Sequence, residues 1–161
     1  MAAECGNDNY NFNIAYISNS VEALESNGVL SDSYTKVGAN IVLSGKAKVD
    51  NFRMSAEFVC PTSKAIATLT TPGKIGFNVY NLSAGYQIND KFEIDARYEY
   101  SKSKIDGALQ EKTKNIAGLL TYSYNDNVSF GFEYLNSVVK DYVAPSKTET
   151  DKVTARISYN F

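Results

Sequence analysis

Charged side chains at alternate positions are the residues of this chain whose chemistry can be judged first. Glu93 and Asp95 stand two positions apart, and a pair of carboxylates at this spacing could share the roles of acid and base. Arg97 follows two positions later and offers the same carboxylates a partner for an ion pair. The ion pair is the favoured interpretation, because the 161-residue chain has no His to act as a base, metal ligand or pH sensor.

Other reactive groups are too sparse to form a site. Cys5 and Cys60 lie far apart without a Cys-x-x-Cys spacing, which argues against zinc. The chain has no Gly-x-Ser-x-Gly elbow and no phosphate-binding glycine loop. Its net charge of -2 gives no basic footprint for nucleic acid. We therefore expect no enzyme activity, no metal, no cofactor and no nucleic-acid partner.

The charged residues belong to segments in which apolar and polar residues alternate, as in a strand with two different faces. In the clearest segment, Phe92, Ile94 and Ala96 alternate with Glu93 and Asp95. Such alternation predicts strands and excludes helices there. Eight segments of this kind cover residues 11–16, 37–44, 51–58, 80–88, 92–100, 115–124, 128–135 and 152–161.

Short and long connections alternate between these segments. Asn89–Lys91 and Asn125–Asn127 predict tight turns, since Asn and Asp tolerate left-handed backbone conformations, and a less regular turn is expected near Lys46–Asp50. Long polar loops are predicted at 18–36, 61–76, 101–114 and 136–151. This order predicts an all-β fold, an eight-stranded antiparallel up-and-down barrel that forms one domain over residues 10–161 after a lead segment, residues 1–9.

The polar face of these strands carries the arginines. Arg53, Arg97 and Arg156 all lie there, whereas most Lys residues fall in the predicted loops and turns. Guanidinium groups suit enclosed ion pairs, so this sorting predicts a polar interior and an outward apolar face, the reverse of a soluble lipocalin-like barrel. We expect a charge network in the lumen made of Arg53, Glu57, Glu93, Asp95, Arg97, Glu99, Glu133 and Arg156.

Aromatic residues gather at both ends of the apolar face, with small and aliphatic residues between them. Toward the short turns lie Tyr86, Phe92, Tyr122, Tyr124, Phe130, Tyr159 and Phe161. Toward the long loops lie Tyr16, Phe58, Tyr80, Tyr98, Tyr100 and Tyr134. Two aromatic girdles around an aliphatic belt are typical of a barrel that crosses a bilayer. A transmembrane β-barrel is therefore the expected fold.

The end of the chain carries a resemblance. Phe161 follows Tyr159, Ile157 and Ala155 at alternate positions, which resembles the terminal signature by which bacterial outer-membrane barrels are recognised for assembly. Together with the eight segments, the chain resembles small eight-stranded outer-membrane proteins of the OmpA and OmpX kind, and its hairpins look like porin hairpins. The resemblance implies that Tyr159 and Phe161 form the assembly signal.

The resemblance also implies a location and partners. We expect a mature protein of the bacterial outer membrane, without its signal peptide in this sequence, in contact with outer-membrane lipid, lipopolysaccharide and the assembly machinery. Its expected role is non-catalytic: the barrel anchors surface loops for binding an extracellular partner, for adhesion or for envelope structure. An alternative is a narrow porin-like channel for ions or small solutes, because interior residues such as Ser55, Ser83 and Gly85 are small. A soluble lipocalin-like ligand-binding barrel is the third interpretation.

Overall fold

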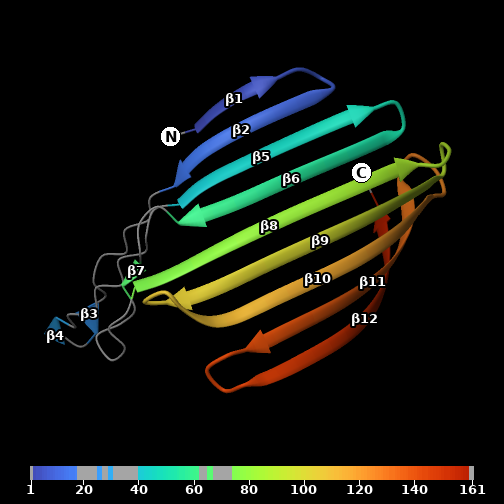
Figure 1. Ribbon diagram of the computed structural model, residues 1–161. Coiled ribbons are helices and arrows are strands. Elements are labelled where there is room, and N and C mark those ends of the chain that lie inside the picture. The colour runs from blue at the N-terminus through green and yellow to red at the C-terminus, as the bar shows by residue number, and fades with distance from the viewer. Residues whose placement is uncertain are drawn as a thin grey trace.

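The protein is a curled β-sheet (Figure 1). A computed structural model describes residues 2–17, 25–26, 29–30, 40–61, 65–66 and 74–159. Across these ranges no helix is long and apolar enough to span a membrane. The strands are β1 (Ala2–Gly6), β2 (Tyr10–Ile17), β3 (Glu25–Ser26), β4 (Val29–Leu30), β5 (Asn40–Val49), β6 (Phe52–Pro61), β7 (Ala65–Ile66), β8 (Lys74–Gln87), β9 (Phe92–Ile105), β10 (Ala108–Ser123), β11 (Val128–Asp141) and β12 (Ser146–Tyr159).

Each long strand pairs antiparallel with its neighbours along the chain. The order is β1-β2-β5-β6-β8-β9-β10-β11-β12, while β7 pairs with β8 alone and β3 with β4 form a separate small sheet. Over the described residues, each of the eight alternating segments lies mainly on a long strand of this order, from β2 to β12. The predicted all-β, antiparallel, up-and-down arrangement is therefore confirmed.

Two predicted loops are in fact strands. Residues 101–114 continue β9 and β10 to a turn at Asp106 and Gly107, and residues 136–151 continue β11 and β12 to a turn at 142–145. Asp106 and Gly107 both have positive φ, 49° and 86°, as a two-residue hairpin turn requires. Most residues on both faces of these extensions are polar, with exceptions such as Val138 and Val139, so the strands continue without the alternation that reveals a half-buried strand.

The short turns form where predicted and asparagine side chains close them, but residues 89–91 and 125–127 have no positive φ, so the left-handed conformations expected there are absent. The Asn89 Oδ1 accepts hydrogen bonds from the backbone N–H groups of Lys91 and Phe92, at 2.9 and 3.0 Å. Asn125 binds the two following amides of its own turn in the same way. Asn7 does so as well, between β1 and β2. The lead segment thus contributes a strand that the sequence analysis did not predict.

This additional strand lies at one edge of the sheet, and β12 lies at the other. β1 pairs with β2 from Ala2 opposite Ala15 to Gly6 opposite Asn11. Over the described residues β12 pairs with β11 alone, so the sheet is open there. The physical reason is that β1 occupies the edge of β2 that an eight-stranded barrel would give to β12. Phe161, the end of the predicted assembly signal, lies outside the described residues.

The apolar side chains of the sheet are exposed. The exposed fraction is 52% for Leu82, 53% for Phe132 and 73% for Ile157. Ala117 is the one buried hydrophobic residue in the described part of the chain, and it belongs to the opposite, polar face. A water-soluble barrel would have its large apolar residues in its interior, so the side-chain distribution is the reverse of that arrangement.

Candidate functional site

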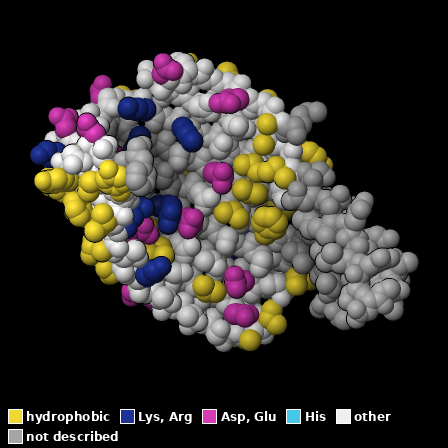
Figure 2. Space-filling view, turned by 180° about the vertical axis from the view of Figure 1, so that it is seen from behind, with side chains coloured by type: hydrophobic (Ala, Val, Ile, Leu, Met, Phe, Trp, Pro, Cys, Tyr) yellow, Lys and Arg dark blue, Asp and Glu magenta, His cyan; other side chains and the backbone are white. Residues whose placement is uncertain are grey.

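The polar side chains of the strands share one face of the curled sheet. Figure 2 shows this face from behind as a hollow in which Lys and Arg side chains lie beside Asp and Glu. It carries every member of the predicted charge network, because these residues occupy the alternate positions that face away from the exposed apolar residues.

Arg53 is the centre of the closest contacts on this face. It extends from β6 across β8 to β9, where its Nη2 donates to Asp95 Oδ1 at 2.8 Å and also bonds to Glu93. The carboxylate pair that could have suggested acid and base chemistry is thus held by a guanidinium. The arrangement joins three strands through one cation.

Gly85 makes this contact between non-adjacent strands possible. In the sheet register it stands between Arg53 on β6 and Asp95 on β9. A Cβ at this position would lie 2.6 Å from the Arg53 Nε and would overlap the Asp95 carboxylate. The missing side chain therefore leaves the space through which the two groups meet.

A second pair spans β10. Arg97 on β9 and Glu133 on β11 approach to 4.0 Å, and both side chains are partly exposed. Ser83, Ala117 and Leu119 join these two residues around a cavity of about 250 Å³. This ion pair is looser than that of Arg53, since it has a single partner at the limit of contact.

Glu57 and Glu99 pair with amides rather than with arginine. The Asn81 Nδ2 donates to Glu57 and the Asn115 Nδ2 to Glu99, both at 3.1 Å. These four residues stand side by side in one row across β6, β8, β9 and β10. The two asparagines were not predicted as members of the network. The feature that identifies them is that each stands opposite a predicted Glu, which becomes visible only once the register between the strands is known.

Arg156 makes no ion pair with any described residue. It stands opposite Gly131 on β11, and a Cβ there would lie 2.8 Å from its Nε. Its guanidinium stem thus lies over a glycine, as Arg53 does at Gly85. Tyr159 stands opposite Val128 and is 57% exposed.

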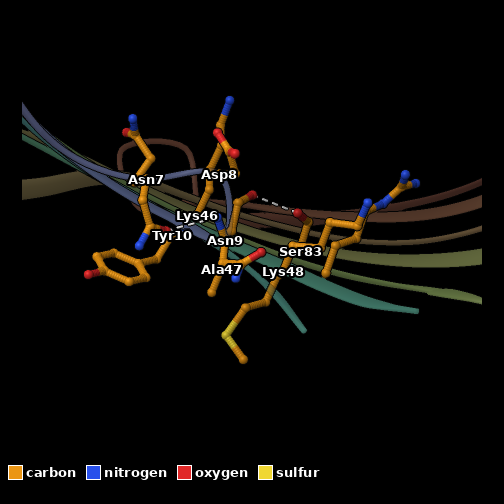
Figure 3. Close-up of a pocket in the computed structure, with 12 residues that line it drawn as sticks. Asn7, Asp8, Asn9, Tyr10, Lys46, Ala47, Lys48 and Ser83 are labelled. Atoms are coloured by element: carbon orange, nitrogen blue, oxygen red, sulfur yellow. Dashed lines mark hydrogen bonds between the residues drawn. The ribbon is translucent and has the colours of Figure 1, made fainter. Parts of the chain in front are cut away.

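A wider hollow of about 390 Å³ lies where the β1–β2 turn meets the polar face. Figure 3 shows Asn7, Asp8 and Asn9 of this turn with Lys46 and Lys48 of β5. A dashed line there marks the Ser55–Ser83 hydrogen bond, 2.7 Å long, in the floor of the hollow. The lead segment thus takes part in enclosing the polar face.

The aromatic residues form two rows on the opposite face. Phe58, Tyr80 and Tyr100 stand opposite one another on β6, β8 and β9, with ring centroids 4.8 and 6.0 Å apart. Nearer the short turns, Phe92, Tyr122 and Phe130 do the same on β9, β10 and β11, at 4.8 and 6.4 Å. Six of the thirteen predicted girdle residues therefore make ring contacts across neighbouring strands.

Neither cysteines nor acidic clusters add a reactive centre to this part of the molecule. Cys5 on β1 and Cys60 on β6 are both free. No group of three or more His, Cys, Asp or Glu within the described ranges could hold a metal ion. The polar face offers charged groups, hydrogen-bonding groups and space for water. Its ion pairs and hydrogen bonds join neighbouring strands.

Comparison with protein-family models gives no match for this chain, and a search of curated proteins gives no match either. The arrangement of its own residues must therefore carry the functional argument.

Proposed function

We propose that this protein is a small, non-catalytic membrane β-barrel of the bacterial outer membrane that anchors projecting hairpins at the surface, where they bind a partner or support the envelope. The observation that supports this proposal most strongly is the exposure of its apolar face, bordered by two aromatic rows. Lipid is the solvent that makes an exposed face of this kind stable.

The spacing of the rows supports the proposal. From Phe92 to Tyr100 the strand β9 advances by about 26 Å, at about 3.3 Å per residue. A tilt of about 40° reduces this to about 20 Å across the bilayer, close to the apolar band of about 25 Å in known barrels. On the apolar face, the residues between them, such as Ile94 and Ala96, carry no charge.

A closed barrel requires a change at the edges of the sheet. β12 runs antiparallel to β2 and parallel to β1, as the alternating pairing dictates. We propose that β1 leaves the edge of β2 and that β12 takes its place, which closes an even number of antiparallel strands. The polar face with Arg53 and Asp95 then becomes the lumen, where small barrels are filled by side chains.

The proposed surface consists of two hairpins that continue beyond the aromatic residues farther from the short turns. β9 with β10, and β11 with β12, continue past Tyr100 and Tyr134 to turns at Asp106 and at residues 142–145. Paired strands hold these turns at fixed positions, unlike free loops. Such rigid projections suit a role in contact and anchoring.

A second candidate, a narrow channel that prefers cations, is favoured by one row of the polar face. Glu57, Asn81, Glu99 and Asn115 bring two carboxylates into line without a Lys or Arg between them. The Oδ1 atoms of Asn81 and Asn115 are buried and accept no hydrogen bond from described residues. A cavity of about 240 Å³ adjoins this row.

Spin labels at two neighbouring positions test the membrane assignment. In a background with Cys5→Ser and Cys60→Ser, Leu82→Cys places a label on the apolar face and Ser83→Cys places one on the polar face. After reconstitution in vesicles, we expect oxygen to collide more often with the label at 82 than with that at 83. A label at 82 that prefers a water-soluble relaxation agent would overturn the proposal.

Conductance in planar bilayers separates the two candidates. An anchor with a filled lumen gives no steady current. A channel gives current steps that prefer cations. In that case Glu99→Gln should move the reversal potential, measured under a salt gradient, toward zero as cation selectivity is lost. Glu111→Gln, near the hairpin end, serves as the matched control.

A further inference from the structure

Lysines line up across the hairpin end of the sheet. Lys102 on β9 stands opposite Lys112 on β10, which stands opposite Lys140 on β11, which stands opposite Lys147 on β12. We call these four residues the lysine ladder. They occupy the same face as the aromatic rows, because Lys102 is two residues beyond Tyr100.

Like charges directly opposite one another on neighbouring strands destabilise a sheet. The compensation within the described chain is partial: Lys147 binds Glu149 at 2.9 Å, and Lys112 lies over the Tyr142 ring at 5.3 Å. No ion pair with a described residue is formed by Lys102 or Lys140. The ladder thus carries an excess of positive charge that an external anion would relieve.

Along the strands, the ladder lies a fixed distance beyond the aromatic row. Tyr100 stands in the aromatic row with Phe58 and Tyr80, and Lys102 is about 7 Å farther along the strand. Aromatic rings of membrane barrels sit at the level of the lipid headgroups, so the lysines reach the outer part of that layer. Their aliphatic stems can lie along the barrel wall while the ammonium groups reach the phosphates.

We infer that the lysine ladder binds the phosphate of an anionic lipid headgroup at the barrel wall. This inference rests on the proposed membrane function, because only insertion brings headgroups to this height. A phosphate monoester carries between one and two negative charges and three strong acceptor oxygens, which several ammonium groups can share without a fixed geometry. The exposed position of Lys140 and Lys147 leaves room for a headgroup.

The test uses the full-length protein in neutral detergent micelles, titrated with phosphatidic acid. The ladder variant carries Lys102→Gln, Lys112→Gln and Lys140→Gln. A control for total charge carries Lys46→Gln, Lys48→Gln and Lys91→Gln, which removes the same charge from the polar face and a short turn at the opposite end of the sheet. Each lysine should contribute about fivefold to the affinity for phosphatidic acid, so we expect the ladder variant to bind it roughly a hundredfold more weakly. The control changes little, since its charges lie beyond the screening length of about 10 Å.

Two further probes define the ligand. Oleate, whose charge is a carboxylate, should bind more weakly than phosphatidic acid, and inorganic phosphate should compete poorly because it is not held in the lipid layer. Equal losses in the ladder and control variants, equal binding of oleate, or full competition by inorganic phosphate would each overturn the inference. The spin label at Leu82→Cys, measured in the same micelles, reports separately whether the apolar face contacts detergent, so failure of the membrane proposal is distinguishable.

Discussion

At the scale of single residues, Arg53 and Arg97 look alike in the sequence but differ in their contacts. Each occupies the polar face, and each was predicted to pair with acids. The structure gives Arg53 two carboxylates in hydrogen-bonding contact and Arg97 one carboxylate at 4.0 Å. Only the register between strands, which the sequence does not state, decides which arginine meets which acid.

Replacement of Arg53 should therefore cost more than replacement of Arg97. Arg53→Ala leaves Glu93 and Asp95 beside each other without their cation, and we expect the free energy of unfolding to fall by about 1 to 2 kcal/mol, because the Arg53 side chain is 53% exposed and its ion pairs are screened by solvent. Arg97→Ala should lower it by less than about 1 kcal/mol, because Arg97 has a single partner at 4.0 Å. Urea unfolding in detergent measures both. Equal effects would contradict the assigned contacts.

Gly85 offers an independent test of the same contact. Gly85→Ala places a methyl group between Arg53 and Asp95, so one of these side chains must move, at a cost of about 1 to 3 kcal/mol in unfolding free energy. Gly118 on β10 is the matched control, since no atom lies within 4 Å of its added Cβ. Gly118→Ala should leave stability unchanged or raise it by up to about 1 kcal/mol. The prediction fails if both variants are equally stable.

At the scale of elements, the sequence predicts the strands that have one apolar face and misses those without it. β9 and β10 were predicted only up to Tyr100 and from Asn115 because most side chains on both faces are polar beyond these residues. The Asp106-Gly107 pair was a hairpin signal that the alternation criterion did not use. Likewise, Asn7-Asp8-Asn9 repeats the Asn-Asp-Asn turn at 125–127 and could have indicated β1.

The position of β1 leads to a prediction about hydrogen exchange. If β12 replaces β1 beside β2 on insertion, the backbone amides of β1 should exchange quickly in lipid, while those of β12 that point away from β11 become protected. Mass spectrometry of exchange in vesicles measures both segments. Protected β1 amides together with unprotected outer amides of β12 would show that the sheet stays open in the bilayer.

Removing residues 2–6 should leave the membrane-inserted exchange pattern of β12 unchanged, because β1 takes no part in the closed form. The same deletion should speed exchange along β2 in the protein without lipid, where β1 covers that edge. Opposite results would mean that the open sheet, with β1 beside β2, is the form in lipid and that the closed barrel is the form without lipid.

At the scale of the whole molecule, the terminal residue separates assembly from stability. As an interfacial side chain Phe161 would contribute less than about 1.5 to 3 kcal/mol, the range for full burial. As an assembly signal its effect is on delivery. Deletion of Phe161 should then lower the amount of protein in the outer membrane of cells far more than it lowers the unfolding midpoint of refolded protein.

Equal yields of the two forms in cells would remove the terminal signature from the argument for this membrane. Tyr159→Ala in a chain that keeps Phe161 should also lower the yield in cells, because Tyr159 is the other residue of the predicted assembly signal. Quantified membrane fractions and refolded samples should be compared for the same three proteins.

The edge of β12 that pairs with no described residue also bears on refolding. The first half of the strand carries Lys147, Glu149 and Asp151, whose charges discourage a second chain from adding there. The second half, Val153–Tyr159, has Arg156 as its single charged residue. An apolar strand edge is a template for intermolecular strand addition, so aggregation during refolding should begin at this half of β12 and increase with protein concentration.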